Sequence, residues 1–149
     1  MDKYDSLLLK NQLCFPTYAA ANKITRKYQP LLEKIDLTYT QYIVMMVMWE
    51  KHEVNEKELC KALFLKTNTL TPLLKRLKEK GFISINKDKE DKRNLVISLT
   101  NKGEKLKEKA IDVPASIAKE FNLTEEEAIF FYKILYKILN DEKEEEWYG

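Results

Sequence analysis

The stretch that decides the fold runs from Thr67 to Thr100 and reads TNTLTPLLKRLKEKGFISINKDKEDKRNLVISLT. Its four leucines between positions 70 and 77 have the spacing of one buried helix face, and Gly81 is placed to end that helix. We expect Pro72 in the first turn of this helix, where proline is tolerated. After Gly81 the apolar period changes to two, in 82–85 and again in 95–99, which predicts two strands. The all-polar loop 86–94 between them predicts a protruding hairpin tip.

Two capping boxes precede this stretch. Asn55 and Glu58 open a short helix with Leu59, Ala62 and Leu63 on one face. Thr38 and Gln41 open an earlier helix that is apolar almost all round, which predicts a buried central helix. We expect the methionines of this helix to fill the core: Met45, Met46 and Met48.

The outer segments also have helical periodicity. Leu7–Leu32 reads as one long helix that Pro16 interrupts. On the other side, Thr100 begins a lysine-rich helix that we expect to bend at Pro114, and a capping box at Thr124 opens a last helix. The acidic tail from residue 141 is expected to fray.

Together the segments predict a mainly α fold with a small β-hairpin wing, that is, a winged helix-turn-helix. Length and a hydrophobic fraction of 44% fit one domain over residues 1–149. We assign residues 36–100 to a DNA-binding lobe, 6–35 and 101–140 to a helical dimerisation region, and 141–149 to the acidic tail. The apolar faces of the N- and C-terminal helices are too large for so small a head to cover, so they are the expected dimer interface.

Composition excludes several classes of protein. Three glycines argue against sandwiches, barrels and propellers, and no apolar run approaches the roughly 20 residues of a membrane span. We therefore expect a cytoplasmic protein. Two cysteines and one histidine leave a zinc site without a fourth ligand, so no metal and no cofactor is expected.

The net charge of +2 hides an asymmetry. Residues 67–105 carry ten Lys and Arg against five Asp and Glu, whereas residues 106–149 carry six against eleven. A basic middle segment attracts a polyanion even when the net charge does not.

These features predict that the helix and the wing bind double-stranded DNA as a homodimer, on a pseudo-palindromic operator with half-sites about 34 Å apart. Small polar side chains at the start of the helix would meet base edges, and cations would meet phosphates. The predicted DNA-binding residues are Thr67, Asn68, Thr69, Thr71, Pro72, Lys75, Arg76, Lys87, Lys89, Asp91, Lys92 and Arg93. Taken singly, the threonines are better explained as a helix-capping cluster, and the wing lysines could belong to an ordinary solvated loop.

The chain resembles the MarR family (multiple antibiotic resistance regulators) over 70–77, at Gly81, and over 91–94 and 97–100. That resemblance implies a dimeric winged-helix transcriptional regulator, not an enzyme. It also implies that Asp91 pairs with Arg93 and that Arg93 enters the minor groove.

A narrower resemblance lies near the N-terminus. Residues 12–15, Tyr18, Tyr28 and residues 37–42 are similar to the organic-hydroperoxide-responsive branch, whose members are thiol-based repressors. The resemblance implies that Cys14 is the sensing thiol and that Tyr28 and Tyr39 hydrogen-bond it from the partner subunit. Phe15 and Tyr18 would line an apolar sensor pocket. With no cysteine after Cys60, the chain resembles the one-cysteine type, in which a low-molecular-weight thiol completes the reaction.

The predicted function is therefore a repressor that releases its operator when an organic hydroperoxide oxidises Cys14. One alternative is a regulator of the same fold released by a small phenolic or aromatic ligand, with Cys14 incidental. A thiol peroxidase is a second alternative, although the sequence offers no resolving cysteine beside Cys14. A helical interaction module without DNA activity is a third.

Overall fold

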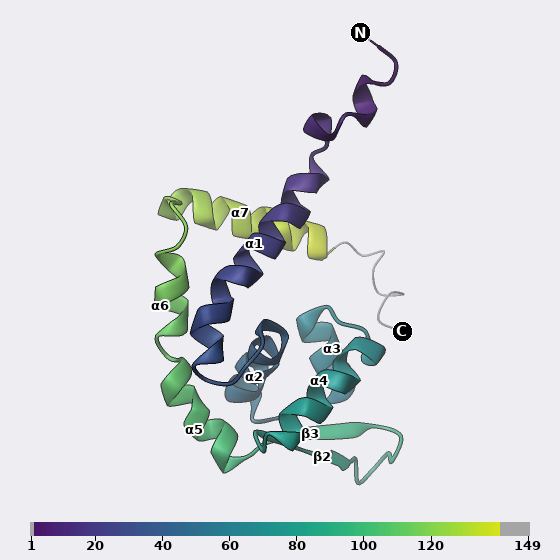
Figure 1. The fold of residues 1–149 in the computed structure, drawn as a ribbon. Helices are drawn as coiled ribbons and strands as arrows, with labels where there is room; N and C mark the ends of the chain where they lie inside the picture. Colours follow the sequence, from purple (N-terminus) through teal and green to yellow (C-terminus); the bar gives the residue numbers. More distant parts are fainter. Residues whose placement is uncertain (1, 141–149) are drawn as a thin grey trace.

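The computed structural model describes residues 2–140, which form a winged-helix head and a set of outer helices (Figure 1). Two short 3-10 helices, Asp5–Leu7 and Leu9–Asn11, precede the first α-helix. The α-helices are α1 (Cys14–Glu33), α2 (Tyr39–Lys51), α3 (Glu56–Leu63), α4 (Thr67–Glu79), α5 (Asn101–Ala110), α6 (Val113–Ala118) and α7 (Glu125–Leu139). The strands are β1 (Glu53–Asn55), β2 (Ile83–Lys87) and β3 (Leu95–Leu99).

The helix α2 is the centre of the head, as its apolar sequence predicts. Val44, Met45 and Met48 are fully buried, and they belong to one core with the leucine face of α4. The prediction was wrong for Met46, whose side chain is 45% exposed. Because α2 and α4 share this core, the position of α4 depends on contacts with α2.

A three-stranded antiparallel sheet in the order β1-β3-β2 forms the wing and its base. Ile97 in the central strand pairs with Val54 on one side and with Ile85 on the other. The hairpin of β2 and β3 was predicted, but β1 was not, because three residues with a single apolar side chain carry no periodic signal.

Local sequence determines where several helices begin. The predicted capping boxes at Thr38, Asn55 and Thr124 are all present, each with both reciprocal hydrogen bonds. Such boxes satisfy helix N–H groups that would otherwise lack partners. Gly81 has a φ of 82°, the left-handed conformation expected after a helix end.

The N-terminal prediction needs correction. The first α-helix begins at Cys14 rather than at Leu7, so Pro16 lies in its first turn and causes no interruption. Cys14 is consequently the first residue of a straight run of helix (Figure 1).

Two other prolines also differ from expectation. Pro72 lies in the second turn of α4, not the first, and its ring nitrogen donates no hydrogen bond to the Asn68 carbonyl. Pro114 lies at the start of a separate helix, α6, so the predicted bent helix is two helices, α5 and α6. The predicted acidic tail lies outside the described residues.

The helix α7 contains no buried residue, and in the view of Figure 1 it passes across α1. Its Tyr136 ring lies 6.4 Å from that of Phe64 at the end of α3. Its exposed large apolar side chains are Ile129, Phe130, Phe131, Tyr132, Ile134, Tyr136 and Ile138. So wide an exposed apolar surface is typical of an interaction face. Within residues 2–140, no helix has the length and apolar character needed to span a membrane.

Candidate nucleic-acid interface and thiol site

The helix α4 presents its polar face to solvent. Its leucines at 70, 73, 74 and 77 are buried, while the predicted contact residues on the same helix are exposed. These exposed residues are Thr67, Asn68, Thr69, Thr71, Pro72, Lys75 and Arg76. The structure therefore brings them together on one accessible face, next to the turn from α3.

The hydroxyl of Thr71 is partly engaged within the head. Its Oγ1 donates to the Thr67 carbonyl oxygen at 2.9 Å and lies 3.4 Å from Oε1 of Glu56 in α3. The first contact occupies a backbone acceptor in the turn that precedes Pro72. Thr71 therefore stabilises the start of α4 as well as facing solvent.

The wing tip is ordered by its own hydrogen bonds. The Asp88 N–H donates to the Asn94 carbonyl at 2.9 Å, and the Asn94 N–H donates to the Asp91 carbonyl at 3.0 Å. Lys87, Lys89 and Lys92 are exposed around this turn. Residues 86–94 carry four Lys and Arg against three Asp and Glu, so the tip has a net charge of +1 and its exposed lysines are the cations it can offer to a polyanion.

Asp91 and Arg93 pair as the resemblance implied. Nε of Arg93 donates to Oδ1 of Asp91 at 3.0 Å and Nη2 donates to Oδ2 at 3.1 Å, while the side chain of Arg93 stays 91% exposed. These side-chain bonds, together with one from the Arg93 backbone N–H, hold the pKa of Asp91 below its ordinary value. The pair limits the rotamers of Arg93 and leaves its outer edge available to a ligand.

The two cysteines lie in different environments. Cys14 is exposed at the first turn of α1, where solvent has access to its sulfur. Its neighbours Phe15 and Tyr18 are also exposed, Tyr18 by 69%. Cys60 is buried, with its sulfur 3.8 Å from Oγ1 of Thr67, which agrees with the packing role expected for it.

The tyrosines at 28 and 39 form a cluster at the other end of α1. Their ring centroids lie 4.9 Å apart, and the Tyr42 ring lies 5.8 Å from that of Tyr28. Burial raises the pKa of all three phenols, and mutual repulsion of their charged forms adds to the shift for Tyr28 and Tyr42. They are therefore neutral O–H donors near neutral pH. Sequence reasoning missed Tyr42, although its spacing of three residues from Tyr39 places both on one helix face.

Cys14 and the tyrosine cluster are not brought together within one chain. Cys14 and Tyr28 are both in α1 and lie about 21 Å apart along its axis, at about 1.5 Å per residue. No hydrogen bond between Cys14 and these phenols is therefore possible in a single subunit.

Comparison with known proteins gives a family. Residues 26–110 match the profile of the family described as "Transcriptional regulator SarA/Rot". The organic hydroperoxide resistance transcriptional regulator of Bacillus subtilis (strain 168) is 43% identical over 116 residues, which cover 78% of this chain and 79% of that protein. The regulator SarZ of Staphylococcus saprophyticus is 38% identical over 140 residues, covering 94% of this chain and 95% of SarZ.

Solved structures agree. Reduced AbfR bound to DNA superposes with a TM-score of 0.76 at 31% identity, covering 93% of this chain and 96% of AbfR. AbfR, a protein of Staphylococcus epidermidis, has also been solved overoxidised on DNA and with a disulfide formed. The winged-helix head, the matched profile and these identities lead to one assignment: the chain belongs to the SarA/Rot transcriptional regulators within the wider MarR family, in the branch of the organic hydroperoxide regulators.

Proposed function

We propose that this protein is a homodimeric repressor that binds operator DNA and releases it when an organic hydroperoxide oxidises Cys14. The observation that carries the proposal is the exposed thiol at the first residue of α1, in a chain whose other thiol is buried. The relatives support it, since the Bacillus subtilis protein is named for organic hydroperoxide resistance and AbfR has been solved on DNA.

The DNA contacts are made by α4 and the wing. The exposed threonines and Asn68 at the start of α4 have the donors and acceptors that base edges in the major groove require. Lys75 and Arg76, one turn further on, contact phosphates. Arg93, held by Asp91 at the wing tip, enters the adjacent minor groove, where the negative potential favours a guanidinium.

The dimer forms through α7 and the N-terminal segment. Both present large exposed apolar side chains that a second copy would bury. Because Cys14 lies about 21 Å from Tyr28 in its own chain, the phenols of Tyr28 and Tyr39 reach a thiolate only across this interface. The sensor is therefore shared between subunits, with the thiol from one and the hydrogen-bond donors from the other.

The first chemical step is a two-electron oxidation. The Cys14 thiolate attacks the terminal oxygen of ROOH, the S–O bond forms as the O–O bond breaks, and the departing alkoxide takes a proton to become ROH. Sulfur loses the two electrons that the peroxide gains. Leu13, Phe15 and Tyr18 are exposed in the single chain and lie near Cys14 in sequence. Buried in the dimer interface, they would give the thiol apolar neighbours, which suits an organic peroxide better than hydrogen peroxide.

The second step makes a mixed disulfide. A low-molecular-weight thiol attacks the sulfenic sulfur, the S–S bond forms, and the hydroxyl leaves as water with the thiol proton. Since AbfR has been solved on DNA in both reduced and overoxidised forms, overoxidation does not by itself prevent DNA binding in that relative. We therefore assign the release of DNA by this protein to the mixed disulfide. Its bulk separates Cys14 from the partner's phenols and changes the distance between the two DNA-binding heads.

The test measures DNA affinity by fluorescence anisotropy before and after cumene hydroperoxide plus a small thiol, on the DNA upstream of its own gene. Wild type is expected to lose roughly a thousandfold in affinity, about 4 kcal/mol, with mass spectrometry placing the adduct on Cys14. Cys14→Ser should keep its affinity, whereas Cys60→Ala, the matched control, should respond like wild type. Equal release from Cys14→Ser would exclude redox sensing, and release by a phenolic compound without oxidation would favour the ligand-responsive alternative.

A further inference from the structure

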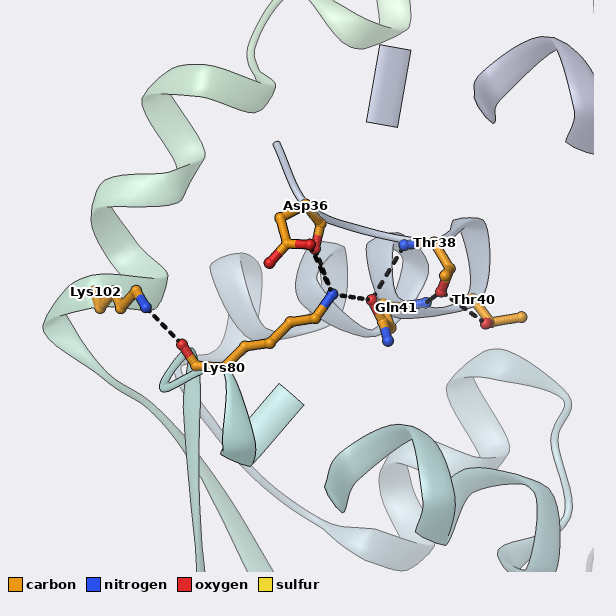
Figure 2. A network of polar contacts seen from close by, with 6 residues as sticks. All are labelled: Asp36, Thr38, Thr40, Gln41, Lys80 and Lys102. Atoms are coloured by element: carbon orange, nitrogen blue, oxygen red, sulfur yellow. Dashed lines mark hydrogen bonds and ion pairs between the residues drawn. The ribbon is translucent and has the colours of Figure 1, made fainter. Parts of the chain in front are cut away.

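We propose that Lys80, the residue that follows the last residue of α4, is a positioning residue that makes α4 move together with the turn between α1 and α2. It would thereby pass the state of the sensor to the DNA-binding surface. This inference rests on the proposed function. The juxtaposition that carries it joins residues about forty positions apart in the chain and is drawn in Figure 2.

The ammonium of Lys80 is held by acceptors that all belong to the turn region. Nζ donates to the backbone carbonyl of Asp36 and to Oε1 of Gln41 at 3.0 Å, and it lies 3.4 Å from Oδ1 of Asp36 (Figure 2). The side chain of Lys80 is only 26% exposed and Gln41 is 2% exposed. Asp36 has a φ of 57°, in the left-handed region. Its carbonyl therefore points in a direction that a residue in extended or right-handed helical backbone does not reach. A partly buried ammonium with this many acceptors is more than a surface ion pair.

One oxygen atom connects Lys80 to the start of α2. Oε1 of Gln41 accepts from Lys80 and also from the Thr38 backbone N–H at 3.1 Å, as part of the capping box. Tyr39 follows Thr38 directly, and its ring packs against that of Tyr28 at a tilt of 51°. A displacement of these two phenols therefore moves the oxygen that holds Lys80.

The same lysine is tied to α5 through its backbone. Nζ of Lys102 donates to the Lys80 carbonyl at 2.7 Å. The end of α4, the α1–α2 turn and the start of α5 thus meet at one residue. Apolar core contacts between α2 and α4 are non-directional and tolerate sliding, whereas charged hydrogen bonds fix register.

A purely structural role would lower stability and DNA affinity in both redox states equally. A positioning role changes the ratio of the two affinities, because that ratio is the coupling between the sensor and α4. The ratio of reduced to oxidised affinity is therefore the readout that separates the two roles.

The experiment compares full-length wild type, Lys80→Met and Lys78→Met by anisotropy on the same operator, reduced and after complete conversion of Cys14 to the mixed disulfide. Lys80→Met keeps the aliphatic stem and removes the donor, and Lys78→Met removes an exposed cation from the same helix as the matched control. We expect Lys80→Met to shrink the ratio by about tenfold or more, the scale of one charge-assisted hydrogen bond per subunit. Lys78→Met should keep the wild-type ratio even if its affinity falls.

An unchanged ratio in Lys80→Met, with Cys14 fully modified, would overturn the inference and leave the proposed function intact. Should Lys80→Met fail to fold, Lys80→Gln, which keeps a solvated polar end without the charge or the reach, is judged by the same ratio. If wild type with modified Cys14 keeps its operator affinity, the proposed function itself has failed, and this inference falls with it. The two failures are distinguished because the first requires a wild-type response and the second shows none.

Discussion

Gly103→Ala should destabilise this protein, although alanine is the better helix former by about 1 kcal/mol. Gly103 lies buried in the first turn of α5, pressed against the base of the wing. A Cβ built on it would lie 2.2 Å from the Phe82 carbonyl oxygen and 2.8 Å from Cδ1 of Leu99. The first of these neighbours is backbone, so a side-chain rotation cannot relieve the contact.

The expected loss of stability follows from the shift of α5 that the added Cβ requires. To reach ordinary contact distance, α5 has to shift by about 1 Å away from Phe82, and such overpacking costs about 1–3 kcal/mol. The shift also weakens the hydrogen bond from Nε1 of Trp49 to the Gly103 carbonyl, which is 2.9 Å long and contributes about 1 kcal/mol. After the gain in helix propensity, which offsets the weakened hydrogen bond, the net loss is about 1–3 kcal/mol, or roughly 3–10 °C in Tm for a chain of this size.

Thermal and urea unfolding followed by circular dichroism would measure the effect, at one fixed protein concentration because a dimer's stability depends on it. Lys109→Ala, an exposed substitution in the same helix, is the control and should change stability by less than about 0.5 kcal/mol. A Gly103→Ala protein as stable as wild type, or more stable, would refute this packing at the α5–wing junction.

Two further predictions concern the wing and the tyrosine cluster. Arg93→Ala should reduce the slope of log affinity for operator against log salt by about 1.8, counting the two wings of a dimer. Arg93→Lys should keep the slope but lower the affinity, because lysine cannot form the bidentate pair with Asp91. Equal slopes for all three proteins would mean that Arg93 touches no phosphate. In a spectrophotometric titration, Tyr28, Tyr39 and Tyr42 should ionise above the ordinary tyrosine pKa of about 10, because burial raises their pKa. Since the unfolded chain then ionises first, these three phenols should lower the stability only as the pH rises above about 10. A single transition near pH 10 for all eight tyrosines would contradict this.

Much of the head could be predicted because its signals are local. The capping boxes at Thr38, Asn55 and Thr124 join residues three apart, and the leucine face of α4 repeats within two turns. The Asp91–Arg93 pair is equally local. Errors arose where a local signal was ambiguous: Pro16 was read as an interruption because its sequence neighbours do not show that the helix begins at Cys14.

Sequence alone thus determined the class of fold and the exposed polar face of α4, since each depends on neighbours along the chain, whereas Cys14 was chosen as the thiol to test by the resemblance to the organic-hydroperoxide-responsive branch. Tertiary structure decided the strand β1, the close approach of Gly103 to Phe82 and the convergence of Asp36, Gln41 and Lys80. These features depend on where distant segments meet, and no period or spacing encodes such a meeting until the apolar core has brought the helices together.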